Sequence, residues 1–315
     1  MNIKEISAQL TAIKQSMQQV VVGKEKALDL MLIALLCRGH VLLEDVPGIG
    51  KTTMVSTLAR SLGLSFNRIQ FTPDVMPSDV TGFSLYNPAS GKFEHHPGAV
   101  MSQLLLADEI NRTSPKTQSS LLEVMQENQV TVDGTTYPVP QPFMVLATQN
   151  PVEHVGTYPL PEAQLDRFMM RISLGYPTIE EEMQIYTRFM DDSPLNHLQP
   201  VIGEEGVLAL QASVSKIYCS EAIKQLVAQI AAETRRHPDL ALGVSPRGSL
   251  MLILASRGAA MLQGREYVLP DDVLALVEPV LVHRLMLRPE GRLRQVSPAY
   301  VLNEILAAIE IPAAR

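Results

Sequence analysis

The first half of the chain alternates between segments of helical periodicity and short apolar runs of strand length. Residues 3–17 carry apolar side chains at helical spacing, and residues 24–38 are apolar on almost all sides, which predicts one amphipathic and one buried helix. Further apolar runs predict buried strands at residues 40–44, 64–72, 103–108, 143–149 and 168–174. This alternation predicts an α/β core.

Two β-hairpins are predicted within this core. Residues 83–96 contain an Asn-Pro turn followed by glycine, and residues 129–139 contain an Asp-Gly pair, which is a strong two-residue hairpin signal. Beyond residue 176 the helical periodicity continues with almost no strand signal. We therefore predict an α/β nucleotide-binding domain at residues 1–176 and a helical domain at residues 177–315.

Composition narrows the class of protein. The chain is 46% hydrophobic and 19% charged, as is ordinary for a soluble globular protein. Its net charge of −7 weighs against binding nucleic acid or anionic lipid through a broad basic face. The N-terminus lacks a signal-peptide pattern, the longest apolar run (LMLIALLC) is too short to cross a bilayer, and the two cysteines show no metal-ligand spacing. We expect a cytoplasmic protein without membrane insertion.

The segment HVLLEDVPGIGKTT, residues 40–53, indicates a phosphate-binding loop. A strand leads through a glycine-rich turn into a helix, which directs backbone N–H groups and the positive end of the helix at one point. Lys51 would add a positive charge near the phosphates, and the Thr52 hydroxyl can be a ligand for Mg²⁺. Asp45 stands where the strict pattern has its first glycine, so a chance turn after a strand remains the alternative when this segment is taken alone.

Polar residues follow two of the predicted strands. LLLADEINR places Asp108 and Glu109 at the end of an apolar strand, where two acids favour a functional role over a purely structural one. Asp108 would help to hold Mg²⁺, and Glu109 would position and deprotonate water, a role typically worth about 10²–10⁴-fold in rate. ATQNP ends another strand with Asn150, whose amide would orient that water, although Asn-Pro is also an ordinary turn signal.

Arginines are the remaining candidates for catalysis. Arg167 in EAQLDRF and Arg247 in GVSPRG are candidates for stabilising the charge of phosphoryl transfer, an effect worth about 10³–10⁵ in rate. Taken alone, either is more often a partner in a surface salt bridge. Arg112, soon after the acidic pair, either faces a subunit interface or pairs with Glu109 or Glu123.

Taken in order, the segments EDVPGIGKT, LLLADEINR, ATQNP, LPEAQLDRF and GVSPRG closely resemble the MoxR family of AAA+ ATPases over essentially the whole chain. The resemblance implies an α/β AAA+ P-loop NTPase core, with a parallel sheet flanked by helices and two β-hairpin insertions, followed by a C-terminal all-α lid domain. The hairpins at about 83–96 and 130–137 resemble insertions of the branch that contains magnesium chelatase and MCM-type ATPases. Residues 264–273 (GREYVLPDDV) resemble the lid signature of that branch.

The resemblance also assigns the site. It implies catalytic roles for Glu109 of the Walker B pair, Asn150 as sensor 1, Arg167 as an arginine finger acting in the neighbouring subunit, and Arg247 as sensor 2 reaching the nucleotide from the lid. Mg²⁺ would be held by Thr52 and Asp108. ATP would contact Asp108, the adenine-binding pair Val22 and Gly23, and the Walker A residues Val46, Pro47, Gly48, Ile49, Gly50, Lys51, Thr52 and Thr53. Family members tolerate varied residues at the position of Asp45, so binding is expected to survive there.

The function implied by the resemblance is Mg²⁺-dependent ATP hydrolysis that drives chaperone-like remodelling, maturation or metal-cofactor insertion in partner complexes. Family members form rings, often hexamers, and work with von Willebrand factor A domain proteins and client enzymes. A nucleic-acid-directed motor or transcriptional activator is the first alternative, which the acidic balance and the lack of a Gly-Ala-Phe-Thr-Gly-Ala loop disfavour. An ATP-gated assembly scaffold with little turnover is the second, and intact Asp108, Glu109 and Arg167 disfavour it.

Overall fold

A parallel β-sheet organises the first part of the molecule. The computed structural model describes residues 2–150, 157–190 and 192–312. Within them, a five-stranded sheet has the order β2-β5-β8-β1-β9, and each neighbouring pair is parallel. All the predicted strands of the core are confirmed: β1 (Val41–Glu44), β2 (Phe66–Gln70), β5 (Leu104–Asp108), β8 (Met144–Gln149) and β9 (Met170–Ile172).

Helices cover both faces of this sheet, which is why its strands read as nearly continuous apolar runs. Successive side chains of a strand point to opposite faces, so Val41 and Leu43 join one hydrophobic cluster while Leu42 joins another. The first cluster includes α1 (Ile3–Gln18), α2 (Glu25–Leu36) and α3 (Lys51–Ser61). The second includes α4 (Pro77–Thr81) and α5 (Pro115–Glu127). The predicted flanking of the sheet by helices is confirmed.

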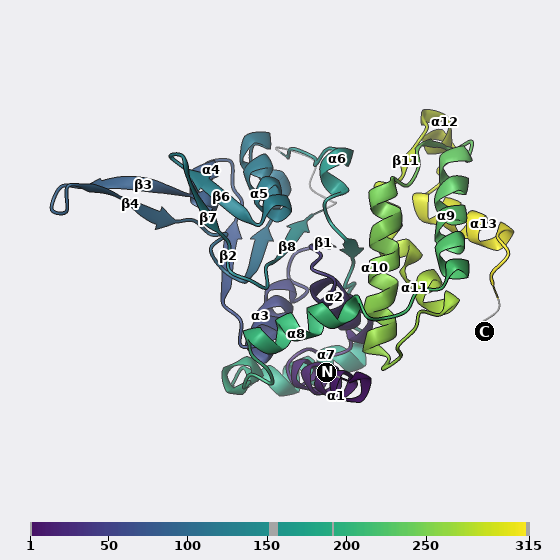
Figure 1. Ribbon diagram of the computed structural model, residues 1–315, viewed down its shortest axis with the longest axis horizontal. Helices are drawn as coiled ribbons and strands as arrows, with labels where there is room; N and C mark the ends of the chain where they lie inside the picture. The colour runs from purple at the N-terminus through teal and green to yellow at the C-terminus, as the bar shows by residue number, and fades with distance from the viewer. Residues whose placement is uncertain (1, 151–156, 191, 313–315) are drawn as a thin grey trace.

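The two predicted hairpins are present and contact each other. One consists of β3 (Gly82–Asn87) and β4 (Lys92–Pro97), and the other of β6 (Gln129–Val132) and β7 (Thr135–Pro138). The His95 ring stacks on Tyr137 with a centroid distance of 4.0 Å, which joins the hairpins near their bases. Figure 1 shows the β3–β4 hairpin extending well beyond the sheet, on the side opposite the lid.

The helices that directly follow residue 176 lie against the core. Arg188 on α7 (Ile179–Phe189) donates through Nη1 to the Gln18 carbonyl oxygen at 2.7 Å. Gln211 on α8 (Glu204–Val214) donates to the Leu35 carbonyl oxygen at 2.7 Å. Although they follow residue 176, α7 and α8 contact the core, and later helices make up the lid seen at the right of Figure 1. The domain boundary after residue 176 therefore stays a prediction.

The lid is helical with one exception. A short antiparallel pair, β10 (Leu240–Leu242) and β11 (Met286–Leu287), corrects the prediction of an entirely α-helical domain. Strands of three and two residues are too short to show a period of two, and they pair across a long stretch of sequence. The remaining elements are η1 (Ile110–Arg112), α6 (Glu162–Leu165), η2 (Pro194–His197), α9 (Glu221–Arg236), α10 (Pro246–Leu262), α11 (Pro270–Leu281), η3 (Val282–Arg284), α12 (Pro289–Leu293) and α13 (Pro298–Ala308).

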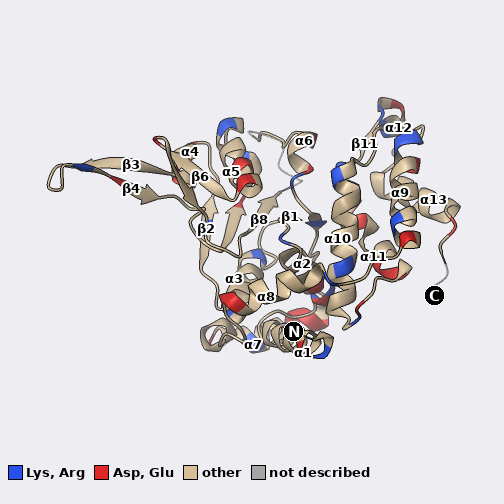
Figure 2. Ribbon diagram, in the orientation of Figure 1, with Lys and Arg blue, Asp and Glu red and all other residues tan. Residues whose placement is uncertain are grey.

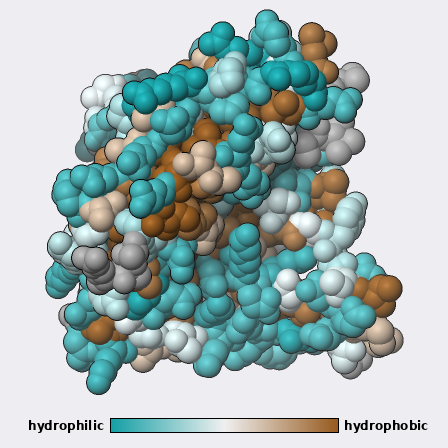
Figure 3. Space-filling view, turned by 90° about the vertical axis from the view of Figure 1, so that its right-hand side faces the viewer, coloured by the Kyte–Doolittle hydropathy of each residue, from teal (hydrophilic) through white to brown (hydrophobic). Residues whose placement is uncertain are grey.

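The surface is mixed in charge. Figure 2 shows basic and acidic positions interspersed over the helices of the core and lid. Figure 3 views the lid side and shows hydrophobic side chains gathered around a hollow in the middle of that face, surrounded by hydrophilic ones. In residues 2–150, 157–190 and 192–312, no helix has the length and apolarity that a membrane span requires.

Candidate functional site

The predicted phosphate-binding loop, here the P-loop (residues 45–52), joins the end of β1 to the start of α3. Gly48 and Gly50 have φ angles of +86° and +90°, a region that favours glycine. A side-chain carbon added at either glycine would meet nothing within 4 Å, so backbone conformation, not crowding, requires glycine here. Lys51 is the first residue of α3, and its Nζ donates to the Asp45 carbonyl oxygen at 2.9 Å. This ammonium group therefore lies over the loop, where phosphate oxygens would replace the carbonyl.

The P-loop opens into a cavity of about 260 Å³, here the P-loop cavity. Residues from three segments that the sequence singled out meet there, together with three individual residues that it did not indicate. The lining consists of Pro47, Gly48, Gly50, Lys51, Thr52, Arg68, Gln70, Asp108, Glu109, Thr148 and Asn150. Val46, Ile49 and Thr53 do not line it, and Ile49 packs against the hydrophobic core instead.

A threonine on the neighbouring strand holds the acidic pair in place. Thr148 Oγ1 donates to Asp108 Oδ1 at 2.6 Å and accepts the Glu109 backbone N–H at 2.8 Å. Glu109 has a φ of +56°, a left-handed conformation that is uncommon for residues other than glycine and that often occurs at functional sites. Both carboxylates line the P-loop cavity.

Arg68 and Gln70 reach the P-loop cavity from β2 and were missed by sequence reasoning. Arg68 Nη2 lies 2.6 Å from Asp108 Oδ2, and Gln70 Nε2 donates to Glu109 Oε2 at 2.6 Å. Gln70 is beside Asp108 in the parallel register of β2 and β5. The signal that could have found them is the alternation of Arg68 and Gln70 within a strand, which places both on one face.

Glu109 has a second partner. The Arg112 Nε lies 3.3 Å from Glu109 Oε2, which supports one of the pairings left open by the sequence, that with Glu109. The proposed base therefore contacts an amide and a guanidinium.

Asp45 is an anchor for the P-loop. Its side chain is 7% exposed and accepts hydrogen bonds from Ser173 Oγ at 2.8 Å and from the backbone N–H groups of Leu174 and Gly175 at 2.5 and 3.2 Å. Asp45 is not among the residues with positive φ, so its position does not require glycine. The aspartate that breaks the strict motif therefore ties the base of the loop to the segment after β9.

The donor set of the P-loop cavity fits Mg²⁺. The Thr52 hydroxyl and the Asp108 carboxylate line one cavity, and oxygen is the ligand that Mg²⁺ prefers. Among the described residues, no three His, Cys, Asp or Glu side chains gather in a way that could hold a metal ion. A cation here would therefore take its other ligands from phosphate oxygens and water, as is common for Mg²⁺ beside a nucleotide.

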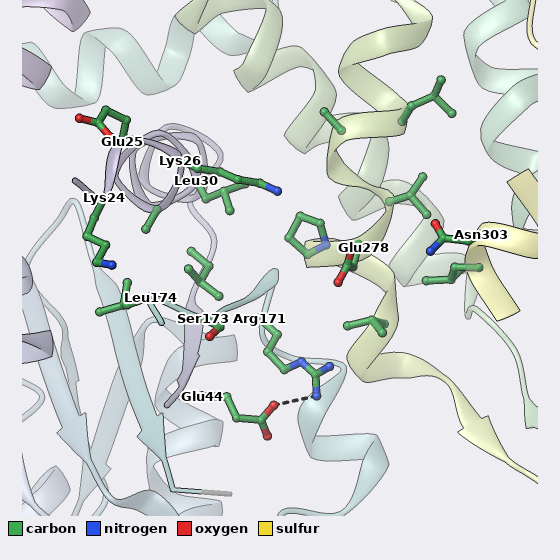
Figure 4. Close-up of a pocket in the computed structure, with 18 of the residues that line it drawn as sticks. Lys24, Glu25, Lys26, Leu30, Glu44, Arg171, Ser173, Leu174, Glu278 and Asn303 are labelled. Atoms are coloured by element: carbon green, nitrogen blue, oxygen red, sulfur yellow. Dashed lines mark ion pairs between the residues drawn. The ribbon is translucent and has the colours of Figure 1, made fainter. Parts of the chain in front are cut away.

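A larger cavity of about 650 Å³ lies between residues of the core and of the lid. Figure 4 shows Lys26 extending from α2 toward the lid, with Glu278 and Asn303 on the opposite wall. At its base, Arg171 Nη1 lies 2.9 Å from Glu44 Oε2. Of the two residues predicted to contact adenine, Gly23 lines this space and Val22 is buried in the core, so that contact stays a prediction.

Arg167 and Arg247 lie at the other end of β1. The Met169 N–H donates to the His40 carbonyl oxygen at 2.8 Å, which places the segment that carries Arg167 beside the start of β1. Ser245, the N-cap of α10, donates through Oγ to Asp166 Oδ2 at 3.2 Å, which brings the first turn of α10, with Arg247, to the same place. The P-loop follows the opposite end of β1, and neither arginine lines its cavity. We call the two regions the P-loop end and the arginine end.

Comparison with known proteins identifies the family. The profile of the "ATPase family associated with various cellular activities (AAA)" matches residues 40–170, and the profile "AAA lid domain" matches residues 232–305. The chain is 42% identical to Chaperone MoxR1 of Mycobacterium tuberculosis, over 94% of this chain and 80% of that protein. The chain belongs to the MoxR family of AAA+ ATPases.

Two further similarities support this MoxR-family assignment. Uncharacterized protein YeaC of Bacillus subtilis is 50% identical over 96% of this chain and 94% of its own length. The crystal structure of a candidate ATPase from Cytophaga hutchinsonii superposes with a TM-score of 0.93 at 38% identity, covering 99% of this chain and 97% of that one. The predicted AAA+ core and lid are confirmed, and the chain is an ATP hydrolase.

Proposed function

We propose that this MoxR-family ATPase works as a homo-oligomeric ring, in which each P-loop cavity binds Mg²⁺-ATP and receives Arg167 and Arg247 from the neighbouring subunit. The observation that carries the proposal is that both arginines lie at the end of β1 opposite the P-loop. Four strand residues span roughly 13 Å, more than an arginine side chain can bridge. A head-to-tail contact between copies brings the arginine end of one subunit to the P-loop end of the next, and such contacts close into rings.

The residues of the P-loop cavity divide the chemistry among them. The P-loop N–H groups and Lys51 bind the phosphates, and Glu109 takes the proton of the attacking water, which Asn150 helps to orient. Mg²⁺ held by Thr52 and Asp108 would neutralise negative charge on the phosphate oxygens. Gln70 and Arg112 both contact Oε2 of Glu109 and help to orient its carboxylate for its role as the base. Arg167 and Arg247 stabilise the negative charge that develops on the transferred phosphoryl group.

We further propose that hydrolysis remodels a protein partner. One relative bears the name Chaperone MoxR1. The β3–β4 hairpin, which extends beyond the sheet, exposes a group of large apolar side chains suited to contact another protein: Phe83, Leu85, Tyr86 and Phe93. A hexameric ring in the cytoplasm, with a von Willebrand factor A domain protein and a client enzyme as partners, completes the proposal by family resemblance. The mixed charge of the surface and the net charge of −7 favour protein over nucleic acid as the partner.

Mixing two inactive variants tests the ring. Lys51→Ala subunits keep their arginines but lose the phosphate anchor, and Arg167→Ala subunits keep the P-loop but lack the arginine. If subunits mix at random in equal amounts, about a quarter of the interfaces join an intact P-loop to an intact Arg167. The mixture should therefore regain up to about a quarter of the normal ATPase rate, whereas each variant alone is nearly inactive.

The control is a mixture of Lys51→Ala with Lys51→Ala, Arg167→Ala subunits, in which no cavity can bind ATP. This control should show no recovery. An absence of recovery in the test mixture, with mixed rings confirmed by mass spectrometry of differently tagged subunits, would contradict the sharing of arginines between subunits.

A further inference from the structure

A buried arginine of the lid, Arg284, forms hydrogen bonds with the segment that carries Arg167. Its side chain is 2% exposed, and its Nε donates to Asp166 Oδ1 at 2.8 Å. Its Nη2 donates to the carbonyl oxygens of Asp166 at 3.3 Å and Phe168 at 2.6 Å, and its Nη1 to that of Met169 at 3.3 Å. The backbone on both sides of Arg167 is therefore bonded to one lid side chain.

The same contacts include the start of α10. Ser245 donates to the Asp166 carboxylate, two residues before Arg247. Gly248 lies so close to Arg284 that a side-chain carbon built there would come within 2.8 Å of Arg284 Cδ. A glycine therefore lets Arg284 pass beside α10 to reach Asp166. Residues 166–169, the first turn of α10 and η3 pack as one unit, which we call the arginine unit.

Charge makes Asp166 central to the arginine unit. Burial and the nearby Arg247 lower the pKa of Arg284 to about 10, while the charge and hydrogen bond of Asp166 act to raise it. Among the described residues, Asp166 is the acid that pairs with Arg284, and a buried guanidinium without its carboxylate is strongly disfavoured. Loss of the carboxylate would loosen residues 166–169 from the lid while leaving Arg167 itself in the chain.

We infer that Asp166 and Arg284 are positioning residues for catalysis in the neighbouring subunit: they fix Arg167 to the lid, so that the lid of the subunit lending the arginine determines where that arginine lies. This inference rests on the proposed sharing of Arg167 between subunits. It adds a direction of communication, because a movement of one lid changes hydrolysis in the next P-loop cavity and not in its own.

The test introduces Asp166→Asn into only one of the two kinds of subunit in the mixed ring at a time. Subunits with Lys51→Ala donate Arg167, and subunits with Arg167→Ala accept it. Adding Asp166→Asn to the donor should lower the recovered ATPase rate by about 10- to 10²-fold, since a misplacement of about 1 Å can cost 10²-fold. Adding it to the acceptor should leave the rate within about twofold, because the Asp166 of the acceptor serves an interface that has no Arg167 to position.

Placement separates a positioning role from a merely structural one, which would lower the rate equally from either side. Equal losses, or no loss in the donor, would overturn the inference. A mixture without Asp166→Asn that recovers no activity would overturn the sharing of Arg167, and the inference with it. Glu221→Gln, which alters an exposed ion pair with Lys224 on α9, is the control in the donor and should change nothing.

A milder pair of variants guards against misfolding of Asp166→Asn. Ser245→Ala removes one hydrogen bond to Asp166, and Arg284→Lys keeps the charge but not the set of bonds to residues 166–169. Both should lower the rate only when placed in the donor, with ring size unchanged by size-exclusion chromatography. A rate that depends on the acceptor instead would overturn the inference.

Discussion

The charged side chains at the P-loop end of the sheet and those at the arginine end differ in the partners that they contact. At the P-loop end, Arg68 pairs with Asp108 and Arg112 with Glu109, and all of these except Arg112 line the P-loop cavity. At the arginine end, the guanidinium group of Arg284 donates hydrogen bonds to residues 166 and 168. The guanidinium groups of Arg167 and Arg247, in contrast, make no hydrogen bond or ion pair with any residue that the structure describes.

This difference shows which part of the site each end lacks. The P-loop end carries the proposed base Glu109, phosphate anchor Lys51 and metal ligand Asp108, each in contact with another group of the chain. At the arginine end, the Asp166 carboxylate is engaged by Arg284, and neither Arg167 nor Arg247 has an acidic partner among the described residues. Each end supplies what the other is missing, which is the property expected of two surfaces that meet in a head-to-tail ring.

The largest expected effect separates catalysis from binding. Arg167→Ala should lower the ATPase rate of the ring by about 10³–10⁵-fold, because an arginine finger acts mainly on the transition state. Nucleotide affinity, measured by titration with a fluorescent ATP analogue, should stay unchanged. Arg236→Ala is the control, since Arg236 is 76% exposed on α9. A parallel loss of affinity would mean that Arg167 serves the cavity of its own chain, and the contrast between the two ends would fail.

The next effect concerns the proposed base at the P-loop end. Glu109→Gln should slow hydrolysis by about 10²–10⁴-fold while ATP stays bound, because an amide cannot accept the proton of water. Single-turnover measurements with radiolabelled ATP would show the bound, uncleaved nucleotide. Glu123→Gln, at an exposed position on α5, should behave as the unaltered protein. Normal turnover in Glu109→Gln would remove Glu109 from its role.

A third prediction uses the histidine at the arginine end. His40 is buried and neutral: its Nε2 donates to the Met125 carbonyl oxygen, and its Nδ1 accepts the Val145 N–H, both at 3.0 Å. Burial, with a smaller contribution from Arg247, lowers the pKa of His40 from 6.5 to about 4. The unfolded chain therefore takes up a proton below pH 6.5 that the folded chain refuses until about pH 4.

The contribution of His40 to the free energy of unfolding should thus be constant above pH 6.5 and fall as the pH drops toward 4. At about 1.36 kcal/mol for each pH unit, the loss is about 3 kcal/mol. Urea unfolding at several pH values would measure it. His40→Leu should reduce this dependence, leaving the part due to His283, whose pKa burial also lowers, whereas His197→Gln, on the exposed surface, should not change it. An equal slope in His40→Leu would show that His40 is not the group responsible.

The smallest expected effect tests the anchor of the P-loop. Asp45→Asn should lower the free energy of unfolding by about 2 kcal/mol, because an amide cannot accept all three hydrogen bonds from residues 173–175 and leaves a buried donor unpaired. Urea unfolding at neutral pH measures it, and Asp74→Asn, at an exposed position, should leave the curve unchanged. An unaltered Asp45→Asn protein would make this residue a passive substitution, as the sequence alone suggested.

Much of the fold was readable because its signals are local. The apolar runs of β1, β5 and β8, the Asp-Gly turn of the second hairpin and the glycines of the P-loop each depend on residues close in sequence. The strands β10 and β11 escaped prediction because they exist only through pairing across the lid. Arg68 and Gln70 escaped for a similar reason: their proximity to the acidic pair depends on which strand β2 lies beside.

The sequence by itself determined the chemistry of this protein: a phosphate loop, an acidic pair and two arginines, in an order that resembles one ATPase family. Tertiary structure alone decided where those groups lie. The parallel pairing of β1 with β9 places Arg167 and the P-loop at opposite ends of the sheet, and the packing of Arg284 fixes Arg167 to the lid. Spacing along a chain carries residue types and local geometry, whereas distance between segments is fixed only once strands have chosen their neighbours.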